Sequence, residues 1–339
     1  MTTPRYEFSK KIMAENLRWI KRHLGASIFY SLKCNSSPVV LQALSELDCG
    51  FEISSRSELD ALLSIGIGAD RIICGQMIKK CEFIIELKER QINYYVFDDM
   101  REYEKLLVHV PEAKKILRIY VKDLDSYCIG FGMEPDLIDR NLGSMTSLDG
   151  LSFHISNNTN IETVIKALDR VESILRRVPI ASPPFILNIG GSYEISEELL
   201  PFYKTVGERL SALRRLYPLT VYAEPGAAIV NNAGRVITEV IMVKEHKGYT
   251  DVYLDAGIPI GVMRPPGSIA LQNHSLRHPR RKFYRFFDTT SLHRVLFQGK
   301  YDWIIRDKDI LELNDYGAYT LCYRNDFHKW EKPQERLWE

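Results

Sequence analysis

A lysine, a histidine and a glutamate each follow a short apolar run, where a buried strand would end. Lys33 follows "SIFYSL", His154 follows "GLSF" and Glu224 follows "VYA". A lysine that has lost part of its hydration shell is a better nucleophile, so we expect Lys33 to be partly buried and reactive. The alternative is a lysine whose stem covers apolar surface while its amine reaches water.

The other two side chains also have a chemical and a structural interpretation. His154 can stack on a planar ring or transfer a proton, or it can be a hydrogen-bonded core histidine. Glu224 ends an apolar run, where a carboxylate needs a partner. A protonated ring nitrogen or an arginine at the rim of a barrel would each serve.

Two further motifs could hold a phosphate group. In "NIGGSY" (188–193) the glycines Gly190 and Gly191 can expose backbone N–H groups, although most such pairs are simple turns. In "GAYT" (317–320) Tyr319 can reach a phosphate oxygen or pack in a core.

Composition is that of a globular protein with one large or two medium domains. The 339 residues include 45 Lys+Arg and 44 Asp+Glu, so we expect no binding to nucleic acid or to an anionic membrane. No apolar run approaches the roughly 20 residues that span a bilayer, and the N-terminus lacks the apolar core of a signal peptide. The six cysteines show no C-x-x-C spacing and the eight histidines no metal-binding pair. We therefore predict a cytoplasmic protein without a metal site.

Short apolar runs alternate with helical patterns over the first 226 residues. Eight β-then-α units predict a (β/α)₈ barrel, with an open doubly wound sheet as the alternative. In either fold the chemistry lies at the carboxyl ends of the strands. The strand candidates are 27–32, 50–54, 71–75, 94–98, 115–121, 151–156, 185–190 and 221–226.

The pattern changes after Ala233. "GRVITEVIMVKE" and "TDVYLDAGI" are typical of strands without intervening helices, which predicts a second, all-β domain from about residue 235 to the end. Residues 263–294 are loop-like, and their basic cluster "RHPRRKFYR" could be a polyanion site. We predict a solvated mobile loop instead, because no wider basic face supports such a site.

Taken in this order, the motifs resemble those of the fold-type III pyridoxal-phosphate decarboxylases, the family of ornithine, arginine and diaminopimelate decarboxylases. "YSLKCN" is similar to the family's Y-x-x-K-x-N, "FEISSRSEL" to F-D-x-x-S-x-x-E-L and "GLSFHIS" to G-x-S-F-H-x-G-S. "NIGGSY" resembles D-I-G-G-G-F, and "AEPGAAIV" resembles E-P-G-R-x-x-V. The resemblance implies a barrel over 11–234 and a β-domain formed by 1–10 and 235–339.

The resemblance also implies pyridoxal 5′-phosphate as cofactor and assigns roles. Lys33 would hold it as a Schiff base, His154 would stack on its ring, and Glu224 would keep the ring nitrogen protonated. These three form the implied catalytic set. The implied cofactor-binding set is Lys33, Glu52, Arg118, His154, Asn157, Gly190, Gly191, Ser192, Glu224, Gly226 and Tyr319.

The match breaks at the substrate end. The family motif G-P-x-C-D-x-x-D, donated across a dimer interface, aligns with "VLFQGKYD" (295–302). Gln298 then replaces the cysteine, Gly299 replaces the aspartate that binds a distal amine, and only Asp302 is retained. Ala227 stands where the family has an arginine that binds the phosphate. These three residues, Gln298, Gly299 and Asp302, are our predicted substrate and interface positions.

A buried, unpaired ammonium is costly, so loss of that aspartate argues against free ornithine, lysine or arginine. We predict a homodimeric decarboxylase that acts on the α-carboxylate of a modified or conjugated amino acid in a specialised biosynthetic pathway. The alternative is a non-catalytic homologue that regulates a true decarboxylase by forming mixed dimers. A racemase, which shares the barrel, lacks its expected lysine and tyrosine motifs here.

Overall fold

A computed structural model of the chain describes residues 2–121, 130–156, 160–178, 184–272, 277–292 and 294–338. The chain divides into two compact units. One comprises Ala14–Lys33 and Leu44–Ala228, and the other comprises Met1–Met13, Cys34–Ala43 and Ile229–Glu339. The predicted division at residues 10 and 234 stays a prediction, and the units depart from it mainly at 34–43, which groups with the C-terminal strands.

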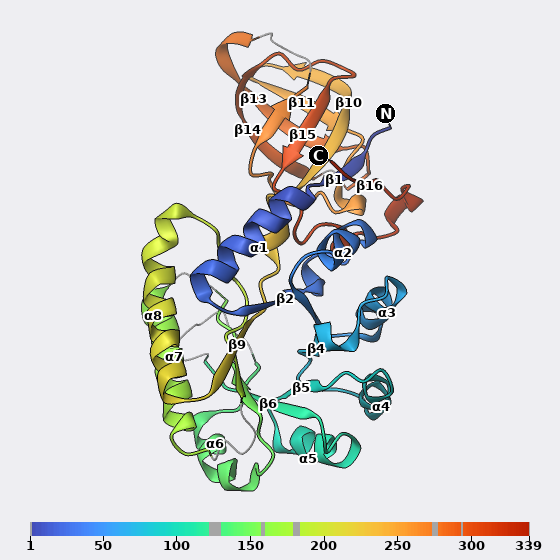
Figure 1. Cartoon of the computed structure of the whole chain (residues 1–339). Helices are drawn as coiled ribbons and strands as arrows, with labels where there is room; N and C mark the ends of the chain where they lie inside the picture. Colours follow the sequence, from blue (N-terminus) through green and yellow to red (C-terminus); the bar gives the residue numbers. More distant parts are fainter. Residues whose placement is uncertain are drawn as a thin grey trace. The chain divides into compact units, whose positions relative to one another are not determined.

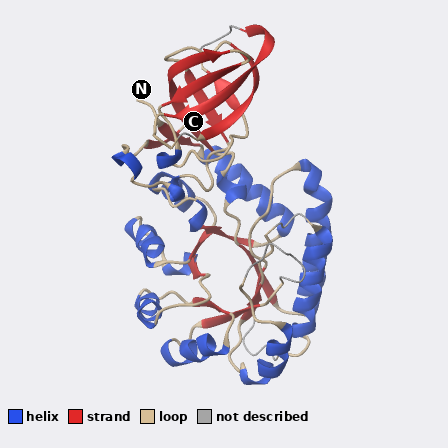
Figure 2. Cartoon of the chain, turned by 180° about the vertical axis from the view of Figure 1, so that it is seen from behind, coloured by secondary structure: helices blue, strands red, loops and turns tan. Residues whose placement is uncertain are grey.

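The first unit is built on a closed barrel of parallel strands, visible as a ring in Figure 2. Pairing between β2 and β9 closes it, which confirms the predicted barrel and excludes the doubly wound sheet. Its strands are β2 (Ser27–Ser31), β3 (Gly50–Ile53), β4 (Ile72–Cys74), β5 (Tyr94–Phe97), β6 (Lys114–Arg118), β7 (Gly150–Ser152), β8 (Phe185–Asn188) and β9 (Leu219–Ala223).

Helices surround this ring (Figure 1). They are α3 (Arg56–Ser64), α4 (Cys81–Glu89), α5 (Met100–His109), α6 (Pro135–Asn141), α7 (Ile161–Leu175) and α8 (Leu200–Leu216). Helix α7 shows why they form: Asn160 caps its first turn, and Val164, Leu168 and Val171 recur at helical spacing on its buried face. The remaining helices are α1 (Lys10–Leu24), α2 (Pro38–Ser45) and the short α9 (Ala227–Val230).

Side chains inside the barrel form layers, because alternate residues of a strand face the same side. Phe29, Tyr94, Ile116 and Ile186, each from a different strand, pack together in one buried cluster. Two residues further along three of these strands stand Ser31, Arg118 and Asn188. Polar groups thus replace the apolar layer at the carboxyl ends of the strands, where the chemistry was predicted.

The second unit is a mixed sheet in the order β12-β15-β10-β11-β13-β14, with β1 paired to β10 and β16. The strands are β1 (Arg5–Phe8), β10 (Gly234–His246), β11 (Tyr249–Leu254), β12 (Ile269–Leu271), β13 (Arg277–Asp288), β14 (Val295–Trp303), β15 (Ile310–Asn314) and β16 (Gln334–Leu337). The N-terminal strand therefore joins the β-domain, as the family resemblance implied.

The prediction of a solvated mobile loop over 263–294 is wrong for β12 and β13, and residues 273–276 and 293 lie outside the described residues. The whole basic cluster lies in β13, which pairs with β11 on one side and β14 on the other. Tyr284 and Phe286 are buried and flank the half-buried Arg285, so a partly buried strand was mistaken for a solvated loop.

Glu7 anchors the N-terminal strand in this sheet. Its carboxylate forms ion pairs with Arg5, Arg235 and Arg336. Burial opposes ionisation, but the hydrogen bonds from Arg5, Arg336 and Arg235 outweigh it and lower the pKa of Glu7 to about 2. This strand therefore depends on an ionised carboxylate.

Candidate active site

The ends of β8 and β9 hold the central carboxyl group of the site. The Asn188 amide, fully buried at 1% exposure, donates from Nδ2 to Glu224 Oε1 at 2.6 Å. The same nitrogen lies 3.0 Å from the Tyr94 hydroxyl oxygen, and Asn188 Oδ1 accepts from the Gly190 N–H at 3.0 Å. One buried amide therefore orients both the carboxyl group and the turn that follows β8.

Glu224 is a half-buried acid in a strongly perturbed environment. Burial, and next the negative charge of Glu52, raise the pKa of Glu224 to about 7. The Asn188 hydrogen bond and the positive charges of Lys33 and Arg118 oppose this rise. A carboxyl group whose pKa lies near 7 can share a proton with a basic nitrogen, which is the role predicted for Glu224.

The glycine pair after β8 is required by close packing. Gly190 has a φ of 68°, and a Cβ there would lie 2.6 Å from the Phe153 carbonyl oxygen. A Cβ on Gly191 would lie 2.4 Å from the Glu224 carbonyl oxygen. The Glu224 N–H donates to the Gly190 carbonyl at 2.7 Å, so the two motifs form one tight structure.

His154 lies beside this turn, in the loop after β7 rather than within the strand. Its Nδ1 accepts from the Gly191 N–H at 3.3 Å, and its Nε2 lies 3.4 Å from Ser192 Oγ. Ser192 is exposed and has a left-handed φ of 65°. The predicted stacking histidine and phosphate loop are therefore in direct contact.

Glu52, predicted beside the lysine, is buried at 4% exposure. Its carboxylate accepts from Ser31 Oγ at 2.6 Å and from Ser54 Oγ at 2.9 Å. Gly75 leaves room for it, because a Cβ there would lie 2.3 Å from Glu52 Oε1. Glu52 is thus held by two hydroxyl groups and contributes negative charge to the site.

Lys33 follows β2 in a short 3-10 helix and is exposed, so the expectation that it is partly buried is wrong. The strand ends at Ser31, and the chain turns before the lysine. Its charge still acts on the site, because it lowers the pKa of Glu224 and opposes the burial that raises the pKa of Glu58. Arg118 Nη1 lies 3.6 Å from Met77 Sδ.

The barrel unit thus brings together most of the predicted site. These residues are Lys33, Glu52, Arg118, His154, Gly190, Gly191, Ser192, Glu224 and the buried Gly226. Asn157 lies outside the described residues. Tyr319 belongs to the sheet unit, where its N–H donates to the Cys34 carbonyl at 3.0 Å.

The predicted substrate positions also lie in the sheet unit, in β14. In this strand Gln298 pairs with Arg285, and Gly299 pairs with Tyr284. Gln298 is exposed, whereas Asp302 is half-buried.

Sequence reasoning missed three polar residues of the barrel mouth: Ser31, Ser152 and Asn188. The signal was present, because each stands two residues after an inward-facing position on its strand. Asn188 was quoted only as the first letter of a glycine motif.

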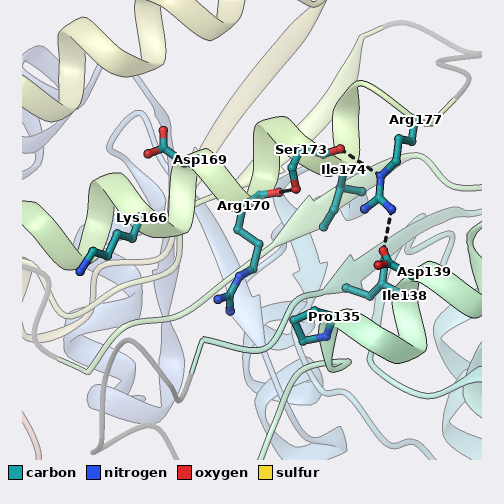
Figure 3. A pocket seen from close by; sticks show the side chains of 9 residues that line it. All are labelled: Pro135, Ile138, Asp139, Lys166, Asp169, Arg170, Ser173, Ile174 and Arg177. Carbon is teal, nitrogen blue, oxygen red and sulfur yellow. Dashed lines mark hydrogen bonds and ion pairs between the residues drawn. The ribbon is translucent and has the colours of Figure 1, made fainter.

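A separate pocket of about 510 Å³ is lined by residues of α6 and α7 and by Arg177. Figure 3 shows Arg177 in an ion pair with Asp139 and bonded to the Ser173 carbonyl. None of the predicted site residues lines this pocket. We therefore place the chemistry at the barrel mouth.

Comparison with known proteins identifies this arrangement. The family model "Pyridoxal-dependent decarboxylase, pyridoxal binding domain" matches residues 9–231. The chain belongs to this family. Membership confirms the predicted class of enzyme, a decarboxylase dependent on pyridoxal phosphate.

Ornithine decarboxylases are among the similar sequences. That of Caenorhabditis elegans is 26% identical over 92% of this chain and 82% of the relative. That of Mus musculus is 26% identical over 69% of this chain, and the match spans only 54% of the mouse enzyme. The chain thus covers little more than half the length of some relatives.

Several solved structures share the fold of this chain. The arginine decarboxylase of Paramecium bursaria Chlorella virus bound to agmatine has a TM-score of 0.89 at 21% identity, covering 100% of this chain and 96% of that one. The lysine/ornithine decarboxylase of Vibrio vulnificus with cadaverine has a TM-score of 0.84 at 22% identity, covering 99% and 92%.

The residues present fit pyridoxal phosphate. The tight turn at Gly190 and Gly191 permits a close backbone approach to a phosphate. Glu224 is poised to pair with a protonated nitrogen, and the Ser152 hydroxyl is a buried polar group with no hydrogen-bond partner in the described chain. Among the described residues, no helix combines the length and apolar character needed to cross a bilayer.

Proposed function

We propose that this decarboxylase removes the α-carboxylate of a modified or conjugated amino acid in a specialised biosynthetic pathway. The observation that carries the proposal is the Asn188–Glu224 pair at the barrel mouth, within the electrostatic reach of Lys33. Burying the Glu224 carboxyl group destabilises the protein unless a ligand pairs with it, so the presence of Glu224 favours a working cofactor site.

When bound, pyridoxal phosphate accepts the electron pair that carbon dioxide leaves at Cα. The chain supplies the rest. Lys33 provides the amine for attachment, Asn188 orients Glu224 Oε1, and the Glu224 carboxyl holds a proton at the facing nitrogen. The tight turn at Gly190 and Gly191 would let the backbone approach the phosphate, Ser192 would bind it, and His154 would orient the ring.

The substrate assignment rests on the residues at 298 and 299. Free ornithine and lysine carry a distal ammonium that needs a carboxylate when it is buried. Gln298 offers an amide and Gly299 no side chain. A distal amine that is acylated or otherwise uncharged needs no carboxylate, and a glutamine can hydrogen-bond to it.

The proposal is tested by binding first and turnover second. Purified protein mixed with pyridoxal phosphate should gain visible absorbance, and borohydride reduction should fix the cofactor on Lys33, as shown by peptide mapping. Lys33→Ala should abolish this labelling, whereas Lys204→Arg, a change at an exposed lysine of α8, should not.

Turnover is then measured as carbon dioxide release from free ornithine, lysine and arginine and from the same amino acids acylated at the distal nitrogen. We expect release from the acylated set. Rapid release from free ornithine or lysine would refute the substrate assignment and leave the cofactor assignment intact.

A second candidate function is regulation of a true decarboxylase through mixed dimers. Ala227, in place of the phosphate-gripping arginine, favours it. A chain that binds no pyridoxal phosphate but inhibits a decarboxylase of the same cell, on mixing, would support this role over catalysis.

We also infer that the active form is a homodimer in which 295–302 contributes to the partner's site. Gly299 replaces the family aspartate that binds a distal amine, so Asp302 is the acidic residue of this motif that remains to be tested. Sedimentation of the loaded protein should give a dimer, and Asp302→Asn should weaken turnover without displacing the cofactor. A monomer with full turnover would contradict this inference.

A further inference from the structure

Two buried hydroxyl groups have no hydrogen-bond partner within the described part of the chain. They are Ser152 Oγ in β7 and Tyr95 Oη in β5. An unpaired buried hydroxyl is destabilising, since it has lost its bonds to water and gained none in exchange. Such a group in a native fold calls for an explanation, and the explanation differs between Ser152 and Tyr95.

Ser152 faces the interior of the barrel. Its β7 neighbour Gly150 is paired with Ile116 and Ile186, both members of the interior cluster. Ser152 stands two residues further along the same face, with 5% of its surface exposed. The hydroxyl is therefore part of the polar layer at the barrel mouth.

The strand register places Ser152 between two members of that layer. It is paired with Arg118 on β6 and with Asn188 on β8. Asn188 uses its side chain for Tyr94, Glu224 and the Gly190 N–H, all at 3.0 Å or less. Ser152 is thus the one member of this row whose side chain makes no hydrogen bond to the described chain.

Tyr95 faces the opposite way. Its neighbours Tyr94 and Val96 belong to the interior cluster, so Tyr95 points out of the barrel toward the helices. Burial, and next the nearby Cys74, raise its pKa well above its usual value. Its ring is fully buried, which accounts for the residue as packing.

We propose that the Ser152 hydroxyl is a cofactor contact, which hydrogen-bonds to pyridoxal phosphate at the mouth of the barrel. This rests on the proposed function, because it requires the cofactor to occupy that mouth. The hydroxyl both donates and accepts, so it can meet a polar atom of either kind. The Ser152 hydroxyl, which has no partner among the described residues, would then gain one when the cofactor binds.

The test compares Ser152→Ala with Tyr95→Phe, since each removes one unpaired buried hydroxyl and little else. Cofactor-free protein is prepared for both variants and the wild type. Thermal unfolding is followed without cofactor, and the dissociation constant for pyridoxal phosphate is measured by titration of the visible absorbance.

We expect both cofactor-free variants to unfold at the wild-type temperature or above it, because each change removes an unsatisfied group. Only Ser152→Ala should bind pyridoxal phosphate more weakly, by about five- to tenfold, which is the size of one hydrogen bond. Tyr95→Phe should bind within about twofold of the wild type.

A Ser152→Ala protein that binds as tightly as the wild type would overturn the inference, whether or not water fills the site, and would leave the proposed function standing. Equal weakening by Tyr95→Phe would overturn it as well. A wild-type protein that binds no cofactor would overturn the proposed function and this inference together.

Discussion

Glu224 makes the stability of the cofactor-free protein depend on pH in an unusual direction. The ordinary pKa of a glutamate is 4.5, and burial with the Glu52 charge raises that of Glu224 to about 7. Between these values the unfolded chain has lost the proton and the native protein retains it. Native protein then binds more protons, so its stability falls as the pH rises from about 4.5 to 7.

The size of this loss follows from the same numbers. A rise from 4.5 to about 7 is about 2.5 pH units, and each unit is worth about 1.4 kcal/mol, giving an upper value of about 3 kcal/mol. Glu224 keeps some contact with solvent, which screens part of the effect and reduces it to about 2 kcal/mol.

Glu224→Gln should remove this loss. The glutamine oxygen can still accept the bond from Asn188 Nδ2, and the side chain has no proton to release. We expect the cofactor-free variant to be more stable than the wild type at pH 8 by about 2 kcal/mol, or about 3 °C in its unfolding temperature. The variant should also bind pyridoxal phosphate more than about tenfold more weakly, since its partner for the ring nitrogen is neutral.

The assay is thermal unfolding of cofactor-free protein between pH 5 and 8. Glu208→Gln, which changes an exposed carboxylate of α8, serves as the control and should follow the wild type. Parallel curves for the wild type and Glu224→Gln would refute the reasoning, because they would show that Glu224 is not held protonated in the fold.

Three other changes test the site and its scaffold. Asn188→Leu should destabilise cofactor-free protein by about 2 kcal/mol in urea unfolding, because it removes the bonds to Glu224 and the Gly190 N–H. Gly191→Ala should abolish cofactor binding in the absorbance titration, since its Cβ would lie 2.4 Å from the Glu224 carbonyl oxygen, whereas Gly143→Ala, in open space, should bind normally. Glu7 has a pKa lowered from 4.5 to about 2, so stability present above pH 4.5 should be lost as the pH falls toward 2, by about 3 kcal/mol in full. Glu7→Gln should flatten this acid limb in circular-dichroism melts, and an unchanged limb would contradict the assignment.

Local sequence determined the elements and the chemistry they carry. Alternation of short apolar runs with helical patterns predicted all eight barrel strands, because each run needs burial on both faces. Lys33, His154 and Glu224 were found because a polar group after such a run is itself a local signal. The glycine pair was visible in the same way.

Tertiary structure decided which of these groups meet. Asn188 joins Glu224 to the glycine turn only because β8 and β9 are neighbours in a particular register, and register depends on the whole barrel. The exposure of Lys33 depends on where β2 ends, and the pairing of β13 depends on strands far away in the sequence. That the Ser152 hydroxyl has no partner among the described residues can be seen only in three dimensions, since a hydrogen bond is a property of two atoms in space and a sequence fixes only their order along the chain.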